Sequence, residues 1–124
     1  MLGSLEKEIM EIVWEDKEVD ARHVQSVIKK RRKIAYTTVN TVLSRLVDKK
    51  LLKARKIGSR GGFKYIYSSM DTKERYEKKV IDATLSRLLK SFGGTTIKYF
   101  SENLNLSKEE VNVLRRKLEE LKDE

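Results

Sequence analysis

The sequence predicts a mainly α-helical chain with one small β-hairpin. Apolar residues recur every three or four positions in three short segments before residue 50, as on the buried face of a helix. A glycine-rich segment, Gly58–Gly62, then separates two runs of strand-like composition. After residue 70, two capping-box patterns each precede a further helical pattern. The expected order is therefore three helices, a hairpin and a second helical region.

Three helices are expected before the hairpin. The first extends from about Ser4 to Trp14 and buries Leu5, Ile9, Ile12 and Val13. The second follows the N-cap residue Asp20, continues to about Arg31 and buries Ala21, Val24, Val27 and Ile28. The third is capped by Thr37 or Thr38 and buries Val39, Val42, Leu43 and Leu46. Residues 15–18 are polar and are expected to be a connector.

The hairpin is predicted between Leu51 and Tyr67. Its first strand, Leu51 to Ile57, alternates weakly, and its second, Phe63 to Tyr67, is aromatic and β-branched. The glycines between them supply the positive φ angles that a tight turn needs. Three helices followed by a hairpin is the order of a winged helix-turn-helix domain, which we assign to residues 1–70. In that fold the third helix reads DNA and the hairpin is the wing.

Residues 71–124 are predicted to form a helical dimerisation region. A helix opens at the capping box Asp71–Glu74 and ends at Gly93-Gly94, a short helix follows over about Thr95 to Asn103, and a last helix opens at Ser107–Glu110. About fifty residues cannot enclose all the apolar positions of these helices, so packing against a second copy is expected. The predicted homodimer interface consists of Leu85, Leu88, Leu89, Phe92, Ile97, Phe100, Val111, Leu114 and Leu118.

Positive charge is concentrated in the first region. The formal net charge is +9; residues 1–70 hold 16 basic and 8 acidic residues, whereas residues 71–124 hold 12 and 11. Between Ala21 and Met70, fourteen Lys or Arg residues accompany a single acid, Asp48. Such a stretch favours a polyanionic partner. The chain has no cysteine and no apolar run of transmembrane length, so a cytoplasmic protein without a metal, a cofactor or a membrane partner is expected.

The exposed face of the third helix is the predicted reading surface. At about 100° per residue, Thr37, Thr41 and Ser44 lie opposite the apolar face. The predicted contacts in the DNA groove are Thr37, Thr38, Asn40, Thr41, Ser44 and Arg45. The predicted phosphate and wing contacts are Lys29, Lys30, Arg32, Lys33, Tyr36, Lys56, Arg60 and Lys64. The alternative for the third helix is a polar face that is only solvated, and the alternative for the wing is a flexible loop with solubilising charge.

Two strings of residues are distinctive: Leu2-Gly3-Ser4-Leu5-Glu6-Lys7-Glu8-Ile9-Met10-Glu11-Ile12-Val13-Trp14 and Tyr36-Thr37-Thr38-Val39-Asn40-Thr41-Val42-Leu43-Ser44-Arg45-Leu46-Val47-Asp48-Lys49-Lys50. Together they resemble the BlaI/MecI/CopY family of penicillinase-type repressors. The resemblance implies a homodimeric repressor bound to a palindromic operator. Two features of the family differ here. Some members are cleaved at an Asn-Phe bond in the C-terminal region, and the nearest candidate in this chain reads Tyr99-Phe100. The Cys-x-Cys motifs of copper-responsive members are absent.

The sequence therefore predicts a transcriptional regulator that binds specific sites in double-stranded DNA as a homodimer and represses. Two alternatives stay open. One is an architectural protein that binds many DNA sequences equally, and the other is a winged-helix module for protein interaction. No group of nucleophile, base and acid suggests an enzyme.

Overall fold

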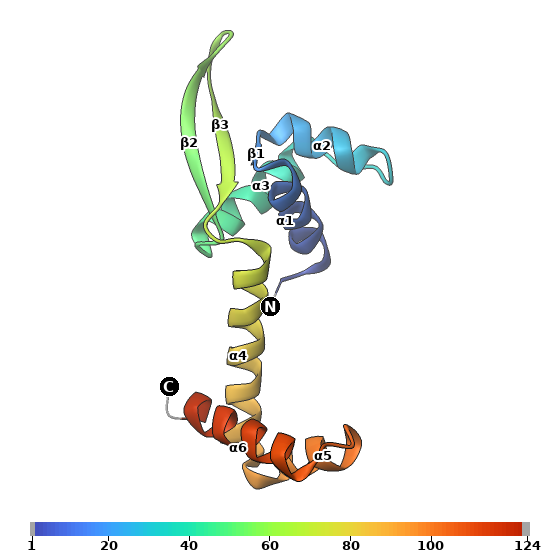
Figure 1. Ribbon diagram of the computed structural model, residues 1–124. Helices are drawn as coiled ribbons and strands as arrows, with labels where there is room; N and C mark the ends of the chain where they lie inside the picture. The colour runs from blue at the N-terminus through green and yellow to red at the C-terminus, as the bar shows by residue number, and fades with distance from the viewer. Residues whose placement is uncertain (1, 123–124) are drawn as a thin grey trace. The chain divides into compact units, whose positions relative to one another are not determined.

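The structure is a computed structural model that describes residues 2–122, and in this range the chain forms six helices and three strands (Figure 1). In order they are α1 (Ser4–Asp16), β1 (Glu18–Val19), α2 (Ala21–Lys29), α3 (Tyr36–Asp48), β2 (Leu52–Ser59), β3 (Gly62–Ser69), α4 (Lys73–Phe92), α5 (Gly94–Asn103) and α6 (Lys108–Lys122). The contacts divide the chain into two units, residues 1–73 and 74–124. The predicted fold class, mainly α with a small hairpin, is confirmed.

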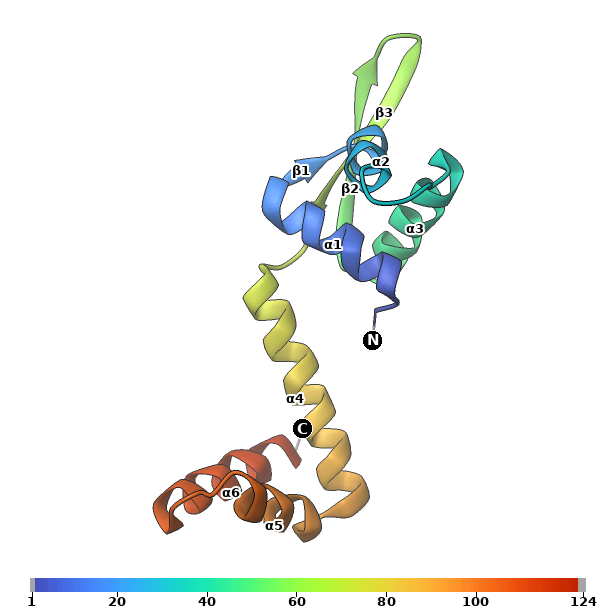
Figure 2. The same ribbon diagram turned by 90° about the vertical axis from the view of Figure 1, so that its right-hand side faces the viewer.

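The first unit is built around one apolar core. The predicted inner residues of α1, α2 and α3 meet there with Leu52 and Tyr67 from the bases of the two hairpin strands. Trp14 packs partly against this core, and its Nε1 donates a hydrogen bond to Asp71 O at 3.2 Å. The hairpin itself extends well beyond the helices (Figures 1 and 2).

Two local predictions in this unit are wrong. Residues 15–18 are not all connector: α1 continues to Asp16, and Glu18–Val19 form β1, which joins the sheet in the order β1-β3-β2. Neither Thr37 nor Thr38 caps α3, because the extended residue before Tyr36, Ala35, is the N-cap. The first helical hydrogen bond already runs from Val39 N to Ala35 O at 3.2 Å, so both threonines lie inside the helix.

The register of the hairpin fixes which side chains share a face. Lys56 pairs with Tyr65 and Gly58 with Phe63, so these four residues lie on the same face. The strands continue to Ser59 and Gly62, which leaves Arg60 and Gly61 as the loop. Gly61 has φ of 79°, where a side chain would be strained.

The second unit has a much smaller core. Leu89, Leu118 and Leu121 are buried together, and Leu85, Ile97 and Leu114 pack partly against them. α5 and α6 lie side by side (Figure 2). α6 packs against the C-terminal half of α4, where Ser86 Oγ donates to Leu121 O at 3.2 Å. The predicted capping box of α6 is confirmed: Glu110 N donates to Ser107 Oγ at 3.1 Å, and Ser107 N donates to Glu110 Oε1 at 3.2 Å. None of the described helices is both long enough and apolar enough to cross a lipid bilayer.

Candidate nucleic-acid interface

The face of α3 that points away from the core carries short polar side chains. Thr37, Thr38, Thr41 and Ser44 are exposed, and the apolar residues Val39, Val42, Leu43 and Leu46 are buried. Thr41 Oγ1 donates to Thr37 O at 2.9 Å, and Asn40 Nδ2 donates to Tyr36 O at 3.3 Å. The hydroxyl oxygen of Thr41 and the amide oxygen of Asn40 keep lone pairs that can accept hydrogen bonds. Short side chains and acceptors of this kind suit close approach to base edges.

Arg45 lies on one flank of this face. At about 100° per residue it shares that flank with Lys49, whose Nζ donates to Glu6 Oε2 at 2.7 Å. Glu6 is buried at the start of α1, and the hydrogen bond from Lys49 lowers its pKa, with smaller contributions from Gly3 N and the charges of Lys49 and Arg45. The flank with Arg45 therefore borders α1, whereas Asn40 is on the opposite flank.

The basic run at the end of α2 is exposed. Lys29, Lys30 and Lys33 point to solvent, and Arg32 is held by α1, because its Nη2 lies 2.7 Å from Glu8 Oε2. Figure 1 shows this turn at the side of the unit away from the hairpin. The phosphate contacts predicted from the sequence thus fall into two separate groups, one at the end of α2 and in the following turn and one on the wing, with Tyr36 apart from both at the start of α3.

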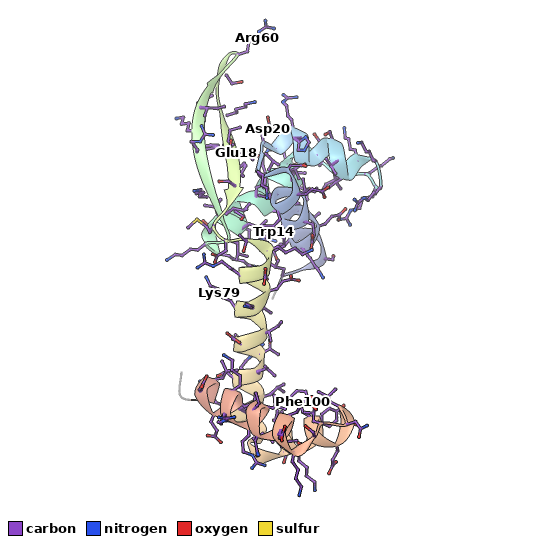
Figure 3. The ribbon with its side chains drawn as sticks, in the orientation of Figure 1. Trp14, Glu18, Asp20, Arg60, Lys79 and Phe100 are labelled. Atoms are coloured by element: carbon purple, nitrogen blue, oxygen red, sulfur yellow. The ribbon has the colours of Figure 1, made fainter. Side chains whose placement is uncertain are left out.

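The wing carries the second group. Arg60 extends from its tip (Figure 3). Lys56 Nζ lies 3.7 Å from the centre of the Phe63 ring, and Lys64 Nζ lies 3.0 Å from Asp20 Oδ2. Burial raises the pKa of Asp20, but hydrogen bonds from His23 N and Lys64 outweigh this effect and bring the pKa below its usual value. Asp20 is therefore ionised near neutral pH.

A pocket of about 340 Å³ lies between the start of α2, the first turns of α3 and the wing. It brings together Tyr36, Asn40, Arg60 and Lys64, which the sequence predicted as separate contacts. Sequence reasoning missed Arg22 and the aromatic residues of β3, which also line it. The aromatic residues had a signal, because Phe63, Tyr65 and Tyr67 alternate and therefore share a face.

The predicted dimer residues fall into two groups in the structure. Leu89 and Leu118 belong to the buried cluster of their own unit, with Leu85, Ile97 and Leu114 partly packed against it. Phe92 is 62 % exposed, and Leu88, Phe100 and Val111 are half-buried. The second group is accessible to a partner.

Comparison with known families gives a match over nearly the whole chain: the penicillinase repressor family model matches residues 2–120. The penicillinase repressor of Staphylococcus aureus is 26% identical over 114 residues, which are 92% of this chain and 87% of that protein. That of Bacillus licheniformis is 26% identical over 122 residues, 98% of this chain and 92% of the relative. The transcriptional regulator BlaI of Mycobacterium tuberculosis is 44% identical over 52 residues, 41% of this chain and 38% of that regulator.

Among solved structures, the chain is similar to Bacillus subtilis PadR in complex with operator DNA. The TM-score is 0.52 at 13% sequence identity, and the similarity covers 82% of this chain and 67% of the PadR chain. At this identity the likeness concerns the fold, and it agrees with the winged helix-turn-helix arrangement.

Proposed function

This chain belongs to the penicillinase repressor family, and we propose that it represses transcription by binding a palindromic DNA operator as a homodimer. Membership of the family makes it a transcriptional regulator; the specific operator, the dimer and repression are the proposal. The observation that carries it is the two-sided character of α3, whose apolar face is buried and whose opposite face presents Thr37, Thr41 and Ser44 to solvent. A helix of that kind can enter the major groove while its back stays in the core.

The two basic groups of the first unit support this mode of binding. Lys29 ends α2, Lys30 and Lys33 lie in the turn before α3, and Lys56 and Arg60 lie on the wing. With α3 in the major groove, the two groups would reach phosphates on either side of it. The related PadR fold was solved with operator DNA, which supports duplex DNA as the class of partner.

The second unit supports the homodimer. Its exposed apolar side chains include Phe92 at 62 %, Tyr99 at 61 %, Leu104 at 58 % and Val113 at 58 % exposure, while its buried cluster is small. Covering such side chains with a second copy is favourable by about 25 cal/mol per Å² of apolar surface. A twofold dimer presents two α3 helices, which match half-sites about one DNA turn, ~34 Å, apart.

The test is a selection of bound duplexes from a random-sequence pool, followed by titration of the selected duplex and a scrambled one. We expect a palindromic consensus, two chains per duplex and a preference of ~10³ or more over the scrambled duplex at one salt concentration. Equal affinity for both duplexes would make the chain an architectural protein, and no binding to either would leave the protein-interaction module. Both outcomes overturn the proposal.

A further inference from the structure

The pocket beside α3 has a mixed aromatic and cationic lining. Its walls include Arg22 from the second residue of α2, Tyr36 from the first residue of α3, and Arg60, Phe63 and Tyr65 from the wing. It borders the flank of α3 that carries Asn40, so it adjoins the exposed polar face of that helix.

The aromatic side of the pocket is a continuous stripe along β3. Tyr67 is buried in the core, Tyr65 is 43 % exposed and Phe63 is 56 % exposed, so the stripe runs from the core toward the tip of the wing. The rings of Phe63 and Tyr65 meet edge to face with centres 5.7 Å apart, and those of Tyr65 and Tyr67 are 6.4 Å apart. Opposite Phe63 stands Gly58, and a Cβ placed there would meet no atom within 4 Å, so the space beside Gly58 is open. The Lys56 ammonium lies over the Phe63 ring, 3.7 Å from its centre. Exposed rings held in this way offer flat apolar surface to a ligand.

The charged side of the pocket is mainly positive. Arg22, Arg60 and Lys64 line it, and the Arg22 guanidinium lies 5.6 Å from the centre of the Tyr36 ring. Among the described lining residues, Asp20 is the only acid, and its carboxylate already accepts hydrogen bonds from Lys64 and His23 N. A ligand with both anionic groups and apolar, flat or ring-shaped parts fits this combination. Phosphate and deoxyribose supply those two parts in a DNA strand.

We propose that this pocket binds the sugar–phosphate strand bordering the groove that α3 reads, with Phe63 and Tyr65 against deoxyribose and Arg22 on a phosphate. The inference rests on the proposed DNA binding and adds residues to it. A duplex that presents its major groove to α3 carries the edge strand of that groove past the flank of the helix. The wing stands at that flank, so the strand passes through the space where the pocket lies.

The test uses the selected duplex with single phosphates replaced in turn by uncharged methylphosphonates, and binding is followed by fluorescence anisotropy. Arg22→Gln should bind the unmodified duplex about tenfold more weakly and lower the salt slope by about one unit. At one position, a methylphosphonate should weaken binding by the wild type but leave the affinity of the Arg22→Gln variant unchanged, because the variant has already lost its contact with that phosphate. Phe63→Ala should weaken binding by about five- to tenfold without changing the salt slope, since the ring carries no charge.

Matched controls lie on the other face of the same hairpin. Arg55 and Ile57 alternate with Lys56, so they face away from Phe63 and Tyr65. Arg55→Gln should leave the map of sensitive phosphates unchanged, and Ile57→Ala should bind within about twofold of the wild type. The pocket assignment is overturned if Arg22→Gln keeps the wild-type map or if Phe63→Ala binds like Ile57→Ala. A wild type that binds all sequences equally, or none, overturns the proposed function and the pocket assignment together.

Discussion

The Asp20 carboxylate and the Lys64 ammonium, 3.0 Å apart, join the start of α2 to the wing. The same carboxylate caps α2, since its Oδ1 accepts a hydrogen bond from His23 N at 2.8 Å. The cap could be predicted from the sequence, because Asp before an apolar helical pattern is a typical N-cap. The pairing with Lys64, 44 residues later, could not. This ion pair holds a wing cation that DNA phosphates would also attract.

Asp20→Asn separates these two roles. Asn caps helices about as well as Asp, so the free energy of unfolding should fall only by the worth of the lost ion pair with Lys64, at most about 1 kcal/mol. Lys64 loses its charged partner, and we expect DNA affinity to rise about two- to tenfold with a salt slope larger by about one unit. Anisotropy titrations at several salt concentrations measure the DNA affinity and its salt slope. Glu18→Gln is the control, because it frees Arg55, which faces away from the pocket; an equal gain in both variants would show only general repulsion between acids and DNA.

The ion pair between Glu6 and Lys49, on the side of α3 that borders α1, makes a contribution to stability that depends on pH. The hydrogen bond from Lys49 lowers the pKa of Glu6 below its ordinary value of 4.5. As the pH falls through this range, Glu6 takes up its proton in the unfolded state before it does so in the folded state. The contribution of Glu6 to stability is therefore fully present above about pH 5.5 and is lost as the pH falls through the folded-state pKa. Glu6→Gln should lower the free energy of unfolding by about 1–2 kcal/mol near neutral pH. Urea unfolding followed by the fluorescence of Trp14, the only tryptophan, should show this difference shrinking toward pH ~3. A difference independent of pH would contradict the assignment.

The helices of the first unit could be predicted because a buried face repeats in the sequence with the helical period. The strand β1 could not, because it has two residues and Val19 is in a strand only through pairing with Tyr67 far along the chain. The start of α3 was misplaced by a local rule: Thr37 and Thr38 are good caps, but the chain before Tyr36 is already extended.

The site was predictable to the extent that it depends on one element. The exposed polar face of α3 follows from its period alone. The pocket does not, because Arg22, Tyr36 and Phe63 come from three elements whose meeting depends on tertiary packing. The same reason applies to the position of Arg45 beside α1. That position is shown by the hydrogen bond from Lys49, on the same flank of the helix, to Glu6 in α1, and this pairing is not visible in the sequence.

Lys50 offers a test of backbone strain at the end of α3. It has φ of 63°, and the chain closes the helix there with hydrogen bonds from Lys50 N to Val47 O and from Leu51 N to Leu46 O. Glycine adopts this conformation without a Cβ penalty, so Lys50→Gly should raise the free energy of unfolding by about 0.5–1 kcal/mol. Lys53→Gly, in the extended strand β2, is the matched control and should lower it. Urea unfolding of both variants measures the difference; a loss in each would mean that Lys50 is not strained.

Phe92→Asp tests the dimer in the full-length chain. The ring is 62 % exposed, so the variant should fold, but a partner would have to bury an unpaired carboxylate. We expect sedimentation velocity to show dimers for the wild type and mainly monomers for the variant at the same micromolar concentration. Phe63→Asp, at a similarly exposed ring in the first unit, should remain dimeric. A monomeric wild type, or a fully dimeric Phe92 variant, would contradict an interface at this position.

Thr41→Val tests whether α3 reads bases. The two side chains have nearly the same shape, so the helix is retained and only the hydroxyl is lost. If Thr41 Oγ1 accepts a hydrogen bond from a base, the variant should lose ~1–3 kcal/mol of discrimination at one position of each half-site and keep its salt slope. Lys30→Ala should behave in the opposite way, with weaker binding to all sequences and a slope lower by about one unit. Titrations against the selected duplex and its single-base variants separate the two patterns. A uniform loss for Thr41→Val across all duplexes would mean that this face of α3 lies in the groove without reading it.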